Sequence, residues 1–252
     1  MATPDWLTPG GARRIAYHRT PPRGEGARRP GVMFLGGYGS DMTGAKAMAL
    51  EGWARESGRA FLRFDYAGHG ASAGRLEDGC VGDWAEDALA AMEALTEGPQ
   101  VLVGSSMGGW IALLLALRAP QRVAALVGVA AAPDFTEDLM WAGLGEADRA
   151  RLMAEGRLAL PNRYGDAPRI ITRRLIEDGR DRLVLRAPLP LPFPVRLLHG
   201  TADPDVPMAV ALRLLDHIDC PDARLTLLKD GDHRLSGPAE LALLTATAEG
   251  VA

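Results

Sequence analysis

The sequence VLVGSSMG at residues 101–108 decides the fold prediction. It begins with three apolar residues, and glycines stand two positions to either side of Ser106. An apolar segment of helical periodicity follows over residues 110–118. This pattern is typical of a buried strand that turns sharply into a helix and exposes a serine at the turn. Ser105 does not fit the turn position, because valine and methionine would flank it.

The rest of the chain alternates between short apolar runs and segments of helical period. Runs that are mainly apolar occur at residues 32–35, 60–64, 101–103, 123–129, 195–198 and 225–228. Helical periodicity occurs at residues 44–57, 83–97, 106–118, 208–218 and 238–249. Strands that are apolar on both faces belong in a parallel sheet with helices on both sides. The alternation therefore predicts an α/β fold with a mostly parallel central sheet, formed by residues 1–252 as a single domain.

Residues 133–194 interrupt the alternation, and they are too many for a simple connection between two core strands. Residues 146–156 and 167–179 have the pattern of amphipathic helices, and a series of prolines at 188–194 suits an extended return to the sheet. We expect this insertion to form a small helical cap. Its place between two core strands predicts that it covers the carboxyl edge of the sheet, where open α/β folds bind ligands.

Composition excludes several classes of protein. Of 252 residues, 47% are hydrophobic and 24% charged, which is ordinary for a globular chain with a full core. The net charge of −4 provides no positive field for nucleic acid or an anionic membrane. Cys80 and Cys220 lack the spacing of a metal site, so no metal is expected. No apolar run approaches the roughly 18 residues of a membrane-spanning helix, and no secretory signal is visible, so the expected setting is cytoplasmic.

A serine hydroxyl needs a base to take its proton and an acid to orient that base. Residues 229–234 follow the last predicted strand and contain His233, which places this histidine on a loop at the carboxyl edge of the sheet. His233 is therefore the predicted base. His199 and His69 also follow strands, but a structural role, hydrogen-bonded to loop backbone, is the favoured interpretation for both.

The acid is expected on the loop that follows the strand at 195–198. Asp203 on this loop is the first choice, Asp205 is its nearest rival, and Asp134 after the strand at 123–129 is a third candidate. Each of these aspartates could alternatively serve only as a turn former.

Backbone amides can stabilise the oxyanion that forms during acyl transfer. One donor is expected at Met107, directly after the serine, and the other at Tyr38 in the glycine-rich loop 36–40, with Gly39 as the second choice. The same glycines could form a phosphate-binding loop, but the lysine and Ser/Thr ending of such a loop is missing. Nucleotide binding is therefore disfavoured.

Several segments together resemble those of α/β-hydrolase-fold serine hydrolases. They are GGYGSDM at 36–42, FDYAGHGAS at 64–72, the turn around Ser106, HGTADPDVP at 199–207 and GDH at 231–233. The residues of these segments are similar to those of the abhydrolase-domain group, which includes palmitoyl-protein thioesterases, acyl-glucuronide esterases and their bacterial relatives. The resemblance implies Ser106 as nucleophile, Asp203 as acid and His233 as base, in that chain order, with no cofactor. Gly36 stands where a histidine is usual in the family, which changes the lining of the pocket.

The predicted reaction is hydrolysis of carboxylic esters through an acyl-enzyme on Ser106. Thioesters would use the same machinery, so the expected partner is a small-molecule acyl ester or thioester. A catalytically idle module that only binds a ligand stays open as an alternative from another class. Cap residues are expected to line the acyl pocket, although plain packing against the core is an equal alternative for them; they are Phe135, Leu139, Met140, Trp141 and Leu144.

Overall fold

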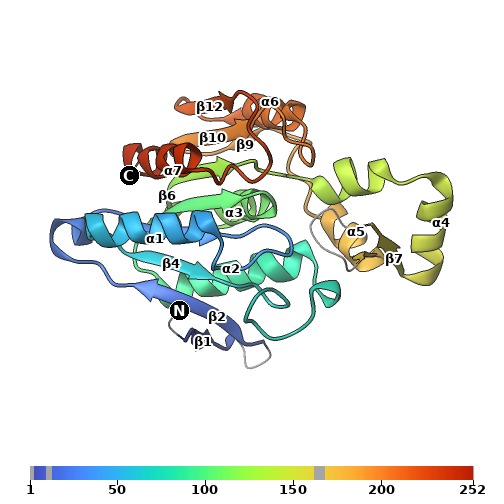
Figure 1. The fold of residues 1–252 in the computed structure, drawn as a ribbon, viewed down its shortest axis with the longest axis horizontal. Helices are drawn as coiled ribbons and strands as arrows, with labels where there is room; N and C mark the ends of the chain where they lie inside the picture. The colour runs from blue at the N-terminus through green and yellow to red at the C-terminus, as the bar shows by residue number, and fades with distance from the viewer. Residues whose placement is uncertain (1–2, 10–12, 162–167, 252) are drawn as a thin grey trace.

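The computed structural model describes residues 3–9, 13–161 and 168–251. Its centre is an eight-stranded sheet in the order β1-β2-β4-β3-β5-β6-β10-β12 (Figure 1). These strands are β1 (Asp5–Leu7), β2 (Ile15–Thr20), β3 (Gly31–Leu35), β4 (Phe61–Phe64), β5 (Gln100–Ser105), β6 (Val123–Val129), β10 (Val195–Gly200) and β12 (Ala223–Leu228). Strand β2 pairs antiparallel with β1 and β4, and all other neighbours are parallel. The predicted α/β class with a mostly parallel sheet is confirmed.

Helices cover both faces of this sheet. They are α1 (Ala45–Ser57), α2 (Val81–Leu95), α3 (Met107–Arg118), α6 (Met208–His217) and α7 (Pro238–Gly250). Helices α1 and α7 pack on one face with Val32 and Phe34 of β3, whereas Met33 and Leu35 of β3 point to the opposite face, which α2, α3 and α6 cover. Successive residues of a strand point to opposite faces, so both faces of β3 must be apolar. This double burial explains the uninterrupted apolar runs in the sequence.

A long insertion separates β6 from β10. It contains the π-helical turn η5 (Thr136–Trp141), α4 (Glu146–Glu155), β7 (Arg157–Leu160), β8 (Arg169–Thr172), α5 (Arg173–Arg180) and β9 (Leu189–Pro190), which pairs with β11 (Ile218–Asp219). In Figure 1, α4, α5 and β7 lie together to one side of the sheet. Residues 162–167 of the predicted cap lie outside the described residues.

The sequence predicts a helical insertion, but the insertion also contains an antiparallel pair of strands, β7 and β8. Leu158 on β7 and Ile171 on β8 are buried together in a small apolar cluster of the insertion. Helix α5 begins at Arg173, later than predicted, where the Thr172 side chain accepts a hydrogen bond from the Leu175 amide at 3.1 Å. Thr172 is thus the N-cap of α5. Because an N-cap residue has an extended backbone conformation, the helix cannot begin before it.

The start of α3 lies against the end of β3 more closely than any side chain would allow. A Cβ atom added to Gly108 would lie 2.0 Å from the carbonyl oxygen of Leu35 and 2.6 Å from that of Gly36. A Cβ atom at Gly104 would lie 2.3 Å from the Gly108 carbonyl oxygen. Both glycines are therefore required by the approach of backbone to backbone, since no flexible side chain could move aside.

We expect Gly108→Ala to lower the free energy of unfolding by about 3 kcal/mol or more, because its Cβ would overlap fixed backbone atoms. Gly143→Ala is the matched control, because a Cβ there has no heavy atom within 4 Å. Urea unfolding followed by circular dichroism measures both variants. Equal stability of the Gly108 variant and the wild type would contradict the described packing of α3 on β3.

Candidate active site

Ser106 lies at the turn between β5 and α3 in a backbone conformation that is rare for a non-glycine residue, with φ 54° and ψ −119°. Its amide donates to the Val129 carbonyl at 2.9 Å, and its own carbonyl accepts from the amides of Gly109 at 2.9 Å and Ala132 at 3.0 Å. Such a conformation costs of order 1–3 kcal/mol and persists only where the surroundings impose it. Ser106 itself has the positive φ, whereas the flanking Gly104 and Gly108 do not.

His233 lies on the loop after β12 and contacts both other residues of the predicted constellation. Its Nδ1 lies 2.8 Å from Asp203 Oδ2, and its Nε2 lies 3.0 Å from Ser106 Oγ. An ionised carboxylate only accepts hydrogen bonds, so Nδ1 carries the proton and donates it to Asp203. In the neutral ring Nε2 is then an acceptor, and the Ser106 hydroxyl donates to it. This is the arrangement in which a histidine can take the proton of a serine.

The side chain of Asp203 is fully buried and bonded through both oxygens. Its Oδ1 accepts from the amides of Asp205 at 2.8 Å and Val206 at 2.9 Å. Burial by itself would raise the pKa of Asp203, but the hydrogen bond from His233 and those from the two amides outweigh it, and the net effect lowers the pKa. The group is therefore held as a carboxylate.

The loops that carry Asp203 and His233 are bonded to each other. The amide of Ala202 donates to the Gly231 carbonyl at 3.0 Å, and the amide of Asp230 donates to Thr201 Oγ1 at 2.9 Å. These bonds fix the spacing between the two loops. Both side chains therefore reach the serine from one connected unit.

Lys46, in the first turn of α1, reaches the same loop from another element. Its Nζ donates to the carbonyl of Arg234, the residue directly after His233. Burial lowers the pKa of Lys46 to about 8; nearby Asp232 opposes this lowering and Arg234 adds to it. The contact ties the end of α1 that follows the glycine-rich loop to the position of the histidine. No motif in the sequence singled out Lys46.

Asp134, one of the alternative acids, is engaged elsewhere. It is fully buried and accepts the amides of Val184 at 2.8 Å and Leu185 at 2.9 Å. Its carboxylate thus holds the segment that returns from the insertion, and the structure does not bring it to His233.

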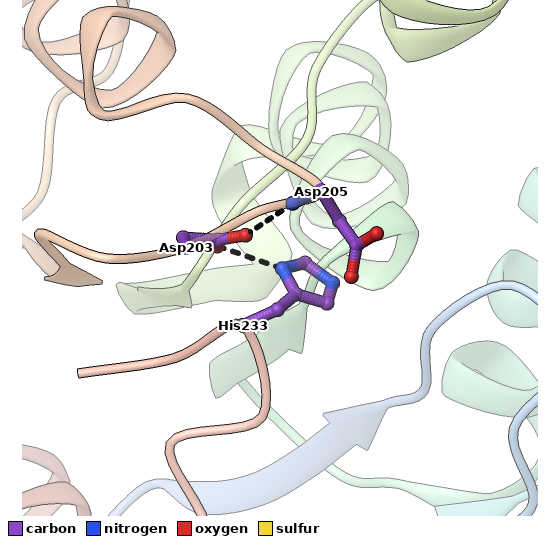
Figure 2. A group of neighbouring side chains, drawn as sticks. All are labelled: Asp203, Asp205 and His233. Atoms are coloured by element: carbon purple, nitrogen blue, oxygen red, sulfur yellow. Dashed lines mark hydrogen bonds and ion pairs between the residues drawn. The ribbon is translucent and has the colours of Figure 1, made fainter. Parts of the chain in front are cut away.

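Asp205, the other alternative, contributes its backbone amide to Asp203 and lines the adjacent cleft. Figure 2 shows its side chain beside His233. One ligand atom each from Asp203, Asp205 and His233 lie within 4.8 Å of one another, a spacing that a metal ion could bridge. An ion bound through Nδ1 of His233 would displace the 2.8 Å hydrogen bond to Asp203, which already uses the proton on that nitrogen.

The two other histidines near strand ends bond to loop backbone, as the sequence suggested. His199 Nε2 donates to the Val206 carbonyl at 2.9 Å, and His69 Nδ1 lies 3.3 Å from the Ala67 carbonyl. Burial lowers the pKa of both rings, to about 4 for His69. Burial therefore favours the neutral form of both rings, and His199 holds the loop on which the Asp203 carboxylate lies.

The glycine-rich loop passes directly over the serine. A Cβ atom at Gly37 would lie 3.3 Å from Ser106 Cβ, and Ser40 Oγ donates to the Gly37 carbonyl at 2.9 Å. The ring of Tyr38 packs edge-on to Trp84, and its hydroxyl donates to the Ile170 carbonyl on β8 at 3.3 Å. Tyr38 therefore links this loop to the insertion.

A cleft of about 650 Å³ opens above Ser106. Core loops line it with Tyr38, Gly39, Leu76, Glu77, Ser106, Met107, Ala132, Pro204, Asp205, Val206 and His233. The insertion adds Phe135, Leu139, Met140, Pro161, Pro168, Arg169 and Ile170. Phe135, Leu139 and Met140 were expected here from the sequence. The contributions of β8 and of residues 76–77 were not, because nothing in the sequence pairs those segments with the serine.

Trp141 and Leu144, also expected on this cleft, are not among its described lining residues. Trp141 lies in the insertion with the guanidinium groups of Arg149 and Arg180 at 5.2 and 4.5 Å from its ring. Leu144 is buried in the insertion's own apolar cluster with Leu152. The described structure thus places both side chains within the insertion and not on the cleft, because a helical turn presents only part of its circumference to the cleft.

Known proteins resemble this chain over nearly its whole length. The family model for the alpha/beta hydrolase fold matches residues 45–158. The mouse protein "Palmitoyl-protein thioesterase ABHD10, mitochondrial" is 39% identical over 221 residues, which are 87% of this chain and 74% of that protein.

Solved structures agree with this match. The crystal structure of a protein described as "Putative hydrolase from Agrobacterium vitis S4" superposes with a TM-score of 0.92 at 42% identity, covering 98% of this chain and 97% of that one. Mouse alpha/beta hydrolase domain-containing protein 10 superposes with a TM-score of 0.89 at 37% identity, covering 99% and 98%. The chain therefore belongs to the alpha/beta hydrolase family and is a relative of the palmitoyl-protein thioesterase ABHD10.

Proposed function

We propose that this hydrolase cleaves acyl thioesters and carboxylic esters through an acyl-enzyme on Ser106. The observation that carries the proposal is the hydrogen-bonded series from Ser106 through His233 to Asp203 beneath a partly apolar cleft. Carboxylic esters were the first expectation from the sequence. The name of the mouse relative, a palmitoyl-protein thioesterase, moves thioesters to the front.

In the proposed mechanism, Ser106 Oγ attacks the acyl carbonyl while its proton passes to His233 Nε2. The Asp203 carboxylate stabilises the imidazolium through Nδ1. The backbone amides of Met107 and Tyr38 hold the oxyanion. In other hydrolases, removal of one such donor lowers kcat by about 10²–10³-fold. Met107 is the first residue of α3, where amides lack partners within the helix.

The proton taken from Ser106 completes the first half of the reaction. His233 returns it to the leaving thiol or alcohol, which departs and leaves Ser106 acylated. Water then attacks the acyl carbonyl while it gives one proton to His233. The bond between the acyl carbon and Ser106 Oγ breaks, the acid leaves, and His233 passes that proton to Ser106. Thiols leave more easily than alcohols, so one site serves both substrate classes.

The side chains around Ser106 suggest how substrate lies in the cleft. Phe135, Leu139 and Met140 give an apolar wall suited to an acyl chain. The leaving group must lie toward His233, since that ring donates its proton, and Asp205 borders this side. The acyl chain is accordingly assigned to the wall formed by the insertion.

The chain's location is a separate matter from its chemistry. Among the described residues, no helix combines the length and apolar character needed to cross a bilayer. The mouse relative is named as mitochondrial. The cytoplasmic setting expected from the sequence stays a prediction.

Hydrolysis of p-nitrophenyl esters from acetate to palmitate, in parallel with acyl-coenzyme A thioesters, tests the proposal. We expect Ser106→Ala to lose turnover by at least about 10⁴-fold on every substrate, because the nucleophile is removed. Ser105→Ala is the matched control and should stay active, since Ser105 belongs to β5 and does not line the cleft. Near-normal turnover by the Ser106 variant would refute the assignment. A wild type without turnover would favour the ligand-binding alternative.

Asp203→Asn should lower kcat by about 10⁴-fold, because an amide no longer holds the histidine in the required tautomer. Asp205→Asn keeps its backbone amide on Asp203 and should lower kcat by less than about tenfold. Steady-state kinetics on one short ester compare them. A larger loss in the Asp205 variant would reassign the acid.

Lys46→Met should lower kcat about tenfold with little change in KM, because the loop that carries His233 loses its contact with α1 and small displacements of a catalytic group are costly. Lys229→Met, at an exposed position directly after β12, is the control. If both lysine variants keep wild-type kcat, the Arg234 contact has no part in positioning His233.

A further inference from the structure

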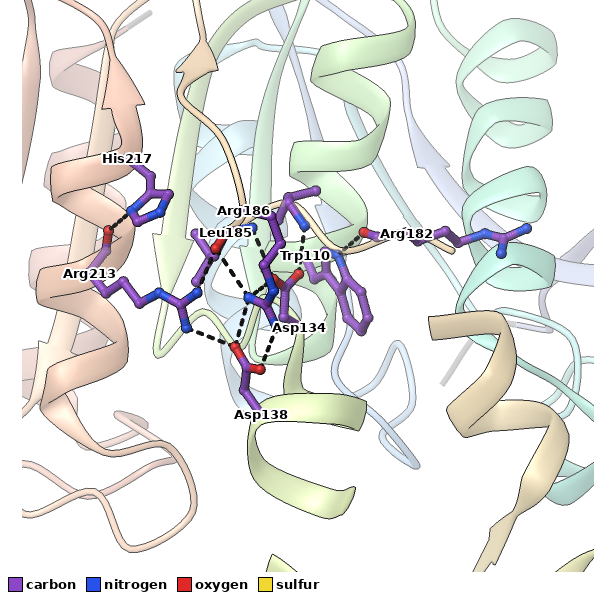
Figure 3. A network of polar contacts seen from close by, with 9 residues as sticks. Trp110, Asp134, Asp138, Arg182, Leu185, Arg186, Arg213 and His217 are labelled. Carbon is purple, nitrogen blue, oxygen red and sulfur yellow. Dashed lines mark hydrogen bonds and ion pairs between the residues drawn. The ribbon is translucent and has the colours of Figure 1, made fainter. Parts of the chain in front are cut away.

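Four charged side chains join the two ends of the insertion to the core, and none of them is among the described residues that line the cleft. We call Asp134, Asp138, Arg186 and Arg213 the cap clasp (Figure 3). Asp138 lies in η5, where the chain enters the insertion; Arg186 lies where it leaves; Arg213 lies on α6 of the core. The clasp thus connects three segments that are distant in sequence.

Asp138 is the centre of these contacts. Its Oδ2 accepts from Arg186 Nη1 at 3.0 Å and from Arg213 Nη1 at 2.8 Å, and its Oδ1 accepts from Arg186 Nη2 at 2.5 Å. Partial burial would raise the pKa of Asp138, but the hydrogen bonds from the two arginines outweigh it and lower the pKa. The carboxylate is therefore ionised and held from two directions.

Asp134 fixes the other side of the clasp. Its Oδ2 accepts from Arg186 Nη1 at 3.0 Å and from the Leu185 amide, and its Oδ1 accepts from the Val184 amide. Arg213 Nη2 also donates to the Leu185 carbonyl. The entering and leaving segments of the insertion are thereby bonded to each other and to α6.

The clasp is continuous with the apolar wall of the cleft. Phe135 directly follows Asp134, and Leu139 and Met140 directly follow Asp138; all three of these residues line the cleft, while neither aspartate does. The Phe135 ring also packs edge-on against Trp110, at 5.6 Å between centroids. A shift of η5 would therefore move the wall without touching Ser106 or His233.

The conformation of η5 makes external contacts important. A π-helical turn is rare and less favourable than an α-helix. Besides the clasp, Arg180 Nε donates to Glu137 Oε2 at 2.7 Å and holds η5 from the side of α5. Arg213 is the one clasp residue that belongs to neither end of the insertion, so it sets η5 relative to the core.

We propose that Arg213, acting through Asp138, is a positioning residue that sets the preference for long over short acyl chains by fixing the wall of Phe135, Leu139 and Met140. The inference rests on the proposed hydrolysis of acyl esters and thioesters at Ser106. Only a long chain extends along this wall, so its displacement affects long substrates selectively. Exposed ion pairs contribute little to global stability, so loss of the Arg213 contact leaves the fold intact.

The test compares p-nitrophenyl acetate with p-nitrophenyl dodecanoate. Arg213→Met is expected to raise KM for the dodecanoate about fivefold, because ground-state and transition-state contacts with the wall weaken together, while kcat and the acetate kinetics stay within about twofold. Arg213→Lys should restore part of the preference. Arg196→Met, which removes a comparable arginine–aspartate contact between β10 and Asp222, is the matched control. It should leave the ratio of the two substrates unchanged.

A double variant shows whether Arg213 acts through Asp138. Asp138→Asn combined with Arg213→Met should raise the dodecanoate KM by less than the product of the two single effects, because the two substitutions share the contact between Asp138 and Arg213. Additive losses, or an unchanged dodecanoate-to-acetate ratio in a folded and active Arg213 variant, would overturn the inference alone. A wild type that hydrolyses neither ester would overturn the proposed function and this inference with it.

Discussion

The conformation of Ser106 is the constraint on which the rest of the site depends. A serine at φ 54° and ψ −119° is strained, and three backbone hydrogen bonds to the neighbouring β6 segment and α3 hold it there. Gly108 allows the first turn of α3 to lie against the carbonyls of Leu35 and Gly36. The same close approach brings the glycine-rich loop over the serine. Packing of the core and placement of the hydroxyl are thus one arrangement.

Around this turn, the remaining groups come from loops that follow separate strands. Parallel strands end at one edge of the sheet, so the loops after β3, β5, β10 and β12 meet there. Direct bonds between the Asp203 and His233 loops, and the contact from Lys46, convert this proximity into fixed distances. Hydrogen bonds keep Asp203 ionised despite its burial. Rigidity of this kind suits a mechanism in which one ring must accept and return a proton without moving.

Much of this arrangement could be predicted from the sequence because it is local. The apolar runs locate each core strand, and glycines two residues to either side of Ser106 locate the turn. Asp203 and His233 each follow a strand, so their meeting with Ser106 follows from topology alone. The insertion was harder, since its β7–β8 pair depends on contacts between Leu158 and Ile171 that no periodicity displays.

The directions of side chains in the insertion were also difficult to predict from the sequence. Met140 and Trp141 are adjacent in η5, but one lines the cleft and the other packs beneath two arginines. Successive residues of a helical turn point in different directions, and the sequence does not show which direction faces the cleft. Asp134 was ambiguous for a similar reason, because its position after a strand suits an acid of the relay as well as a buried support for the returning segment. Only its bonds to Val184 and Leu185 distinguish the two.

The central claim is that Ser106 is the activated nucleophile, and covalent labelling tests it most directly. The protein is treated with a fluorophosphonate, digested, and mapped by mass spectrometry around residues 101–118. A single adduct on Ser106, abolished by His233→Ala in a folded protein, is the result we predict, because only a serine beside a base reacts quickly. An adduct on Ser105, or labelling of Ser106 at an unchanged rate without His233, would contradict the account.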